Sequence, residues 1–458
     1  MVHKAGSRSR AFVPSQILVA SFAGTIILGA AFLYLPASAT TGHTDFIDCL
    51  FTATSATCVT GLAVVGTGSH FTDFGRTVIL ILIQLGGLGI MTGAAFMVML
   101  FGGSLSMRER AIIKDTLNPV RTTRLSAIVV YAVLFTVFTE AVGAAILYSA
   151  FTPIVGREKA YGTAVFHSIS AFCNAGFSTF DTNLERLGGF PAITMTIMML
   201  LIIGGLGFFV MLDLVSGLKK RLTGHHLKGT PMFTLHTRLG LLVTGCLLLV
   251  GTLGLFVLER NHLCANMSTA DALSASLFQS ASARTAGFST VPIGELSDAS
   301  LFLLILLMFI GVCPGSTGGG IKTTTLALIA LFVVARVKGQ SEVNLWGRRI
   351  PDEVINKSLA VTSLAVLALS LSLLVLPVLE RGSPTPPSFI ALIFEATSAF
   401  GTVGLSTGIT PSLTFGGKLV IILLMFIGRL GPLTVATLAA TRARSVKYSF
   451  PEETVMVG

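Results

Sequence analysis

Four short segments of the sequence have residue types that suit the binding of a desolvated cation. Each is a run of small and hydroxyl residues around one glycine. The aligned glycines are Gly61, Gly176, Gly287 and Gly404. Backbone carbonyl oxygens can replace the hydration shell of a small cation without adding a fixed charge. A glycine permits backbone angles that a side chain forbids, so that neighbouring carbonyls can point toward one centre. The chemistry that these segments predict is therefore cation coordination by main-chain oxygens.

The predicted ligands of this filter are the carbonyl oxygens of each glycine and of the two residues before it. They are Val59, Thr60, Gly61, Asn174, Ala175, Gly176, Thr285, Ala286, Gly287, Thr402, Val403 and Gly404. The alternative is that the glycines only permit tight turns between packed helices. One segment alone would favour that alternative. However, the glycines are 115, 111 and 117 residues apart, which is typical of one structural unit repeated four times. The repetition favours a filter.

The elements that must position these segments are apolar helices. Of the 458 residues, 52% are hydrophobic and 11% are charged, whereas soluble domains carry about 25% charged residues. The mean hydropathy is +0.84. Most of eight apolar stretches are near the ~20 residues that cross a bilayer. They are 17–35, 79–100, 127–148, 193–212, 239–258, 301–334 (interrupted), 359–379 and 419–440. The composition predicts an all-α, multi-pass membrane protein.

Each glycine segment lies between two of these stretches, and this order defines a repeating unit. The predicted unit is a span, a half-helix entering from outside, a glycine-centred return and a second span. The four units are 1–107, 108–221, 222–340 with a broken second span, and 341–458 with a short cytoplasmic tail. Irregular backbone at membrane depth is tolerated only where it is buried in protein or lines a watery cavity. Four parallel units with re-entrant loops therefore predict a central pore, and half-helices that end toward it favour cations.

The net charge of +10 and the pI near 9.6 could indicate a nucleic-acid-binding protein. However, most of the 31 Lys and Arg residues lie in alternate loops, for example at Lys4 and Arg8, in 108–124 and in 442–447. Cytoplasmic loops of membrane proteins carry this excess of positive charge. The pattern predicts that both termini are cytoplasmic, and we expect no nucleic-acid partner.

The six cysteines are scattered and form no C-x-x-C motif. Neither a metal site nor a disulfide framework is indicated, and we interpret the cysteines as small apolar fillers.

The second spans share a short cluster of small residues, and in the fourth unit this cluster contains an arginine. Arg429 aligns with Gly87, Gly205 and Val312 of the other units. A charge in the middle of the membrane is unfavourable unless it is hydrated or paired with another polar group, and intramembrane ionisable residues are usually functional. We favour a barrier to cations below the filter. The alternative is that the guanidinium only packs against helix C-terminal carbonyls or an acidic neighbour.

The second span of the third unit is interrupted by a run of residues that cannot sustain a helix. With Arg429, the predicted gate consists of Pro314, Gly315, Ser316, Thr317, Gly318, Gly319, Gly320 and Lys322. We expect a flexible intramembrane loop beneath the filter, with Lys322 adding positive charge or anchoring the loop. The run is not a phosphate-binding loop, because Ile321 separates Gly320 from Lys322 and no strand precedes it.

Four other polar residues in or beside the spans have less specific interpretations. Glu140 and Glu395 could bind ions, but interhelical hydrogen bonding is the preferred interpretation. Arg284 is expected to support the third loop from behind, with a carboxylate as a candidate partner, since an arginine on the axis would expel cations. His167 is interpreted as a packed residue of a half-helix rather than a ligand.

These motifs resemble one known family. The four segments, with Arg284-Thr-Ala-Gly-Phe-Ser-Thr in the third, are similar to those of the Trk/Ktr/HKT superfamily of potassium-translocating proteins. The compact length and the sequence Gly347-Arg-Arg-Ile-Pro351 are most similar to the bacterial KtrB branch. The resemblance covers about residues 17–444. It implies a homodimer in the bacterial inner membrane that conducts K⁺ down its electrochemical gradient. Sodium-preferring relatives often carry Ser in place of the first glycine, so Gly61 supports potassium.

The resemblance also implies partners and ligands beyond the chain. It implies K⁺ as the permeant ion, Na⁺ as a candidate activator and surrounding lipid. It further implies a separate cytosolic ring of nucleotide-binding subunits on the basic inner surface, because this chain has no nucleotide-binding motif of its own.

Two rival functions are open to test. A secondary carrier that couples K⁺ to Na⁺ or H⁺ would bind its substrate at broken helices near the membrane midplane. Most such carriers use inverted halves, whereas these units are parallel. A membrane enzyme would need clustered acids, bases, nucleophiles or metal ligands, and the spans contain almost none. We therefore expect no enzymatic activity.

Overall fold

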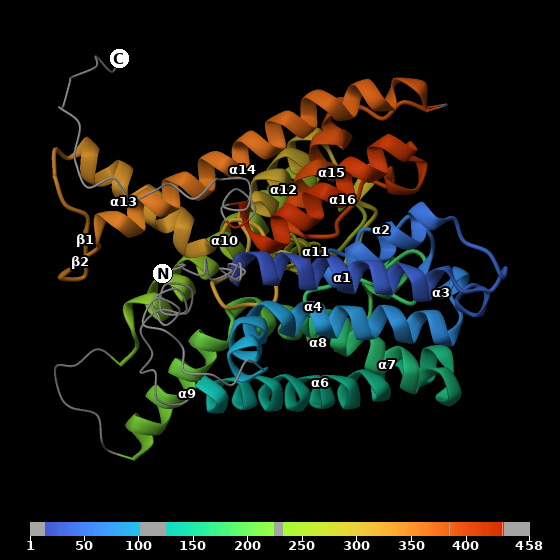
Figure 1. Ribbon diagram of the computed structural model, residues 1–458, viewed down its shortest axis with the longest axis horizontal. Helices are drawn as coiled ribbons and strands as arrows, with labels where there is room; N and C mark the ends of the chain where they lie inside the picture. The colour runs from blue at the N-terminus through green and yellow to red at the C-terminus, as the bar shows by residue number, and fades with distance from the viewer. Residues whose placement is uncertain (1–13, 101–124, 224–231, 384, 433, 435–458) are drawn as a thin grey trace, which may run out of the picture.

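The computed structural model describes residues 14–100, 125–223, 232–383, 385–432 and 434, and these residues are mainly helical (Figure 1). The α-helices are α1 (Pro14–Tyr34), α2 (Phe46–Thr57), α3 (Thr67–His70), α4 (Asp73–Leu100), α6 (Leu125–Val155), α7 (Arg157–Phe172), α8 (Pro191–Leu206), α9 (Phe208–Leu222), α10 (Leu235–Glu259), α11 (Thr269–Ser282), α12 (Asp298–Phe309), α13 (Thr323–Val337), α14 (Asp352–Leu379), α15 (Phe389–Gly401) and α16 (Phe415–Leu430).

Short elements connect these helices. The 3₁₀ turns are η1 (Pro36–Ser38), η2 (Glu185–Leu187), η3 (Ile293–Glu295), η4 (Glu380–Gly382) and η5 (Thr410–Ser412). A small antiparallel hairpin is formed by β1 (Asn344–Leu345) and β2 (Arg348–Arg349), in which Asn344 pairs with Arg349. The hairpin, α9 and α13 lie at one end of the molecule, and α3 lies at the other (Figure 1).

The helical membrane character predicted from composition is confirmed. Within the described residues, three helices are long and apolar enough to cross a membrane alone: Val130–Val155, Leu235–Glu259 and Asp352–Gly382. Helices α8 and α9 qualify together as a fourth, bent pair. Large apolar side chains such as Phe138 and Leu374 are exposed on the outside, as lipid contact requires. The count of eight spans stays a prediction, because part of the last stretch lies outside the described residues.

The stretch 193–212, predicted as one span, is bent by 95° between α8 and α9. Gly207 lies at the bend with a φ of +81°, a conformation that glycine adopts readily. The next residue, Phe208, donates its N–H to the carbonyl of Gly315 at 3.1 Å. The helix therefore turns where the intramembrane segment of another unit supplies a hydrogen-bond acceptor.

The interruption predicted in the third unit is present. Helix α12 ends at Phe309 and α13 begins at Thr323. Residues 310–322 form an irregular segment, which we call the intramembrane loop. Its two ends are tied together, because Gly311 donates its N–H to the carbonyl of Ile321 at 2.7 Å. The loop is therefore anchored at its base.

Helices from successive units pack around one another in a closed cycle. The packed pairs are α4 with α7, α8 with α11, α12 with α15, and α16 with α2. In the predicted division into four units, each pair joins a helix that follows one glycine segment to the helix that precedes another glycine segment. The last pair also contains an ion pair of 2.6 Å between Lys418 and Asp48. This arrangement brings the C-terminal ends of the four half-helices toward one region.

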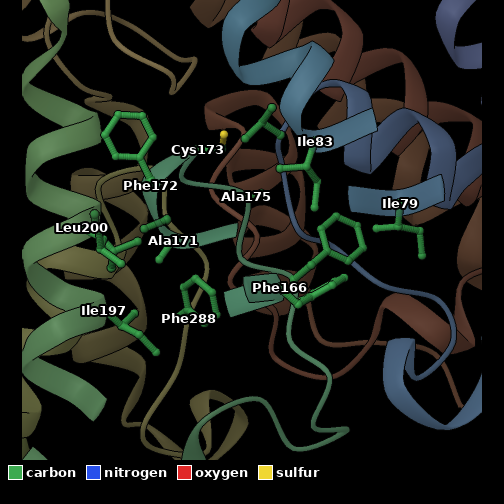
Figure 2. Packing of buried hydrophobic residues seen from close by; sticks show 14 of the residues in the cluster. Ile79, Ile83, Phe166, Ala171, Phe172, Cys173, Ala175, Ile197, Leu200 and Phe288 are labelled. Atoms are coloured by element: carbon green, nitrogen blue, oxygen red, sulfur yellow. The ribbon is translucent and has the colours of Figure 1, made fainter. Parts of the chain in front are cut away.

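Apolar side chains fill the space around the half-helices. Figure 2 shows Phe166, Phe172 and Phe288 packed near Ile197 and Leu200 of α8 around the second glycine segment. These side chains are buried, and burial of each large apolar side chain stabilises the fold by roughly 1.5–3 kcal/mol. The packing holds α7 and its loop in a fixed place.

Candidate functional site

The four glycine segments meet at one place. A Cβ atom added to Gly61 would lie 3.0 Å from the Cα of Gly176, and one added to Gly176 would lie 2.9 Å from the Cα of Gly287. One added to Gly287 would lie 3.1 Å from the Cα of Gly404, and one added to Gly404 would lie 3.1 Å from the Cα of Gly61. The contacts close into a cycle, which we call the glycine ring.

Each glycine of the ring also lies against a carbonyl oxygen of the neighbouring loop. The nearest such oxygens belong to Ala175, Ala286, Val403 and Thr60. A Cβ on Gly176 would lie 2.8 Å from the oxygen of Ala286, closer than real Cβ atoms approach. The ring therefore has no room for a side chain at any of these four positions.

The backbone of the four loops has the same unusual conformation. Each glycine of the ring has a positive φ, between 69° and 93°. The residue two positions earlier also has a positive φ: Val59 at 57°, Asn174 at 59°, Thr285 at 64° and Thr402 at 50°. A positive φ is unusual for β-branched residues and is unfavourable by about 1–3 kcal/mol. Three of the four residues are β-branched and therefore strained, whereas asparagine adopts a positive φ more readily. The recurrence of one conformation in four loops points to a functional constraint on the backbone.

The N–H groups of the loops turn back toward the half-helices. Thr60 donates to the carbonyl of Ser55 at 2.8 Å, and Ala175 donates to that of Ser170 at 2.7 Å. In the other two loops, Ala286 bonds to Ser282 at 2.9 Å and Val403 to Ser398 at 2.8 Å. Since these donors are used within each loop, carbonyl oxygens are the groups left to face a ligand. The negative ends of the half-helix dipoles add to the attraction for a cation.

The intramembrane loop lies directly against the loops of the glycine ring. A Cβ on Gly318 would lie 2.9 Å from the Cβ of Thr285, and one on Gly319 would lie 2.9 Å from Cγ2 of Thr402. The N–H of Gly319 donates to Oγ1 of Thr402 at 2.9 Å. The loop can approach the ring this closely because its own residues carry no side chain there.

Two cationic side chains hold this loop. Arg429 is 3% exposed, and its guanidinium donates to the carbonyls of Thr317 in the loop and Gly86 in α4. The ammonium of Lys322 donates to the carbonyl of Gly318 at 2.6 Å. The partners of Arg429 are carbonyls of the loop and of the middle of α4, and not the helix C-terminal carbonyls or the acidic neighbour considered above. Its two bonds link α16 and α4 to the loop next to the glycine ring.

The remaining polar residues bond to other side chains. Gln84 donates to Glu140 at 3.4 Å, which links α4 to α6. Arg284 is buried and donates to Oγ1 of Thr244 at 3.2 Å, so its partner is a hydroxyl and not the carboxylate considered above. His167 lies among phenylalanine rings and bonds to Ser178.

All six cysteines are free, and five of them are buried. In the described part of the chain, no group of three or more His, Cys, Asp or Glu side chains could hold a metal ion.

Several contacts at this site were not predicted from the sequence. The carbonyl partners of Arg429 and the bend at Gly207 depend on contacts between units. The only sequence signal for the bend was the run of three glycines within residues 204–207. Hydrogen bonds from backbone N–H groups to the serines that follow three of the ring glycines were also not predicted, although the shared Phe-Ser-Thr and Leu-Ser-Thr sequences mark the positions of these serines.

The sequence is similar to those of known cation transport proteins. A family model described as TrkH, cation transport protein, matches residues 5–449. The Ktr system potassium uptake protein B of Bacillus subtilis (strain 168) is 40% identical over 452 residues, which cover 98% of this chain and 97% of the relative. The potassium/sodium uptake protein NtpJ of Enterococcus hirae is 36% identical over 449 residues, which cover 97% of each chain.

A solved structure has a similar fold. The potassium transporter TrkH from Vibrio parahaemolyticus superposes with a TM-score of 0.73 and 22% sequence identity, covering 96% of this chain and 87% of that one. At this identity the likeness concerns the fold.

Proposed function

The chain belongs to the TrkH family of cation transport proteins, and on that premise we propose that it conducts K⁺ across the membrane through the glycine ring. The observation that carries the proposal is the closed cycle of contacts among Gly61, Gly176, Gly287 and Gly404. A cation at the centre of this cycle is surrounded by carbonyl oxygens from four loops. These oxygens replace its water without adding a counter-charge that would trap it.

We further propose that the intramembrane loop is the gate of this path. The loop lies against the ring at Gly318 and Gly319, so an ion leaving the ring on that side meets it next. The guanidinium of Arg429 and the ammonium of Lys322 repel a cation there. At a separation of about 8 Å, one such charge opposes the ion by roughly 0.5–2 kcal/mol for an effective dielectric constant between 20 and 80. Opening would require the loop to leave its carbonyl contacts with Arg429.

The partners follow from the same premise. Relatives are named as proteins of a Ktr system, which supports a second component. We propose that this component is a cytosolic ring of nucleotide-binding subunits. We also propose a homodimer in the bacterial inner membrane with both termini cytoplasmic. A role of Na⁺ as activator is supported by the name of the relative NtpJ, a potassium/sodium uptake protein.

A second candidate function is an ion-coupled carrier, which one observation favours. Two long helical stretches are broken, at Gly207 and at 310–322, and they contact each other where Phe208 bonds to Gly315. Secondary carriers bind substrates at such breaks. The glycine ring favours the channel-like path, because its ligands come from four loops rather than from the broken helices.

The test is flux through the purified full-length chain in liposomes. We expect K⁺ and Rb⁺ to move down an imposed gradient without an opposing or accompanying Na⁺ or H⁺ gradient, and Na⁺ to move more slowly. Replacing Gly61 by Ser brings a side chain against the carbonyl of Ala175, so that K⁺ flux should fall more than Na⁺ flux and the preference for K⁺ over Na⁺ should decrease. Saturable uptake that requires a proton or sodium gradient would contradict the channel-like path and support the carrier.

A further inference from the structure

Three of the four loops share a turn just after the ring glycine. Two residues beyond Gly176, Gly287 and Gly404 lies a serine. Each serine Oγ accepts a hydrogen bond from the backbone N–H two residues further on. The pairs are Ser178 with Phe180 at 3.0 Å, Ser289 with Val291 at 3.3 Å, and Ser406 with Gly408 at 2.9 Å. The outer parts of these loops therefore have the same local structure.

Each of these serines is also linked to a buried polar side chain of its own half-helix. Nε2 of His167 lies 3.0 Å from Oγ of Ser178. Nε2 of Gln279 donates to Oγ of Ser289 at 3.1 Å. In the fourth loop the link has one more member, because Thr410 donates to Glu395 and lies 2.9 Å from Oγ of Ser406. We call these three links the struts.

The chemistry of the struts differs although their positions correspond. Nδ1 of His167 lies 2.8 Å from the carbonyl of Thr163. A carbonyl only accepts hydrogen bonds, so Nδ1 must carry the proton, and in the neutral ring Nε2 accepts from Ser178. Gln279, in contrast, donates to its serine. The struts therefore share a role, which is to hold each loop to its half-helix. They do not share one chemical group or charge.

The first loop has no strut. Ala63 occupies the position of the three serines. Thr52 lies nine residues before Gly61, as His167 and Glu395 do before their glycines. The hydroxyl of Thr52 is buried and has no hydrogen-bond partner. The first loop thus lacks both ends of the link that the other three loops have.

We infer that His167, Gln279 and Glu395 are positioning residues that fix the carbonyls of three loops, and that the unbraced first loop is the part of the ring that yields to a smaller cation. The inference rests on the proposed function. A smaller ion such as Na⁺ is well coordinated only if carbonyls move inward. In a loop that has a strut, an inward movement of the carbonyls breaks the buried hydrogen bond of the strut, which is unfavourable. In the first loop no strut bond has to break. The degree of bracing therefore sets how strongly the ring discriminates against Na⁺.

The test measures the K⁺ to Na⁺ flux ratio of the full-length chain in liposomes. Ser178→Ala and Ser289→Ala each remove the link to the half-helix together with the bond of the shared turn, and we expect each to lower the ratio by at least about 2- to 10-fold, the effect of one hydrogen bond. The matched control is Ser412→Ala, since Ser412 is exposed and bonds only to the carbonyl of Ile409; it should leave the ratio unchanged. The reverse variant, Ala63→Ser, adds the serine of the shared turn to the first loop and should raise the ratio.

The outcomes separate this inference from the proposed function. If the wild-type chain conducts K⁺ but the ratio stays the same in Ser178→Ala, Ser289→Ala and Ala63→Ser, the inference is overturned. A lower ratio in the first two variants with normal K⁺ flux supports it, because a merely structural role would reduce flux and protein yield without changing selectivity. Absence of K⁺ flux in the wild type would instead overturn the proposed function.

Discussion

The glycine ring and the intramembrane loop beside it are built in opposite ways. The ring uses one backbone conformation four times, contains no charged side chain among its predicted ligands, and takes one loop from each unit. The intramembrane loop occurs in the third unit, and it is held by the cations Arg429 and Lys322. Repetition surrounds an ion evenly, as coordination requires. In the proposed function, departure from the repeat supplies the single element that acts as the gate.

The two regions also differ in how firmly they are held. The ring has strained backbone that is fixed by the half-helices and their packing. The intramembrane loop contains five glycines, and the long side chains of Arg429 and Lys322 donate hydrogen bonds to its carbonyls. A region held in this way can change conformation with few losses of packing. The contrast predicts that changes in the ring abolish conduction and changes in the loop increase it.

The largest expected effect is in the ring. In Gly287→Val the side chain would clash with the carbonyl of Val403 and the Cα of Gly176, at a residue with a φ of 75°. We expect Rb⁺ uptake into liposomes to fall roughly 100-fold or more, since clash and strain together exceed about 3 kcal/mol. Gly382→Ala is the control, because a Cβ there meets no atom within 4 Å. Uptake within a factor of two of the wild type in Gly287→Val would show that the ring does not carry the ion.

The next largest effect should come from removing the intramembrane loop. Deletion of residues 315–320 removes the segment that lies against Thr285 and Thr402. We expect flux to rise roughly 10-fold, which corresponds to the loss of a barrier of about 1.4 kcal/mol. The measurement is single-channel or liposome flux on protein whose elution on gel filtration matches the wild type. Unchanged or lower flux in such well-folded protein would count against gating.

A smaller effect is expected from Arg429, and two variants separate its charge from its contacts. Arg429→Ala removes the repulsion and both carbonyl contacts, and we expect K⁺ flux to rise roughly 2- to 5-fold, which corresponds to the lower part of the repulsion given above. Arg429→Lys keeps the charge but cannot repeat the two-pronged contact with Thr317 and Gly86. If the charge is the barrier, the lysine variant stays close to the wild type. Equal increases in both variants would assign the effect to the contacts alone.

The smallest effect concerns stability rather than flux. The ion pair between Lys418 and Asp48 joins the fourth unit to the first and is mostly buried. Lys418→Met leaves the carboxylate without its partner, and we expect the thermal unfolding temperature in detergent to fall by a few degrees. A double-mutant cycle with Asp48→Asn measures the coupling between the two side chains. A coupling free energy near zero would mean that the packing of α16 on α2 closes the cycle without this pair.

Much of the difference between the glycine ring and the intramembrane loop could be predicted from the sequence, because the residues that indicate it lie close together along the chain. The apolar stretches, the four glycines and the helix-incompatible run from Pro314 to Gly320 could each be recognised without coordinates. The bend at Gly207 could not, because it depends on the contact of Phe208 with Gly315. The positive φ of Val59 and Thr402 contradicts the preference of these residue types and is imposed by the surrounding packing. The partners of Arg429 are backbone atoms of distant segments, which no local pattern identifies.

The most direct test of the central claim is to locate the permeant ion. A structure determined in Rb⁺ or Tl⁺, with anomalous scattering data, should contain a peak surrounded by Gly61, Gly176, Gly287 and Gly404, within coordination distance of main-chain oxygens. The same peak should weaken in a crystal prepared in Na⁺. Absence of density inside the ring, with a peak instead beside Glu140 or Glu395, would contradict the account.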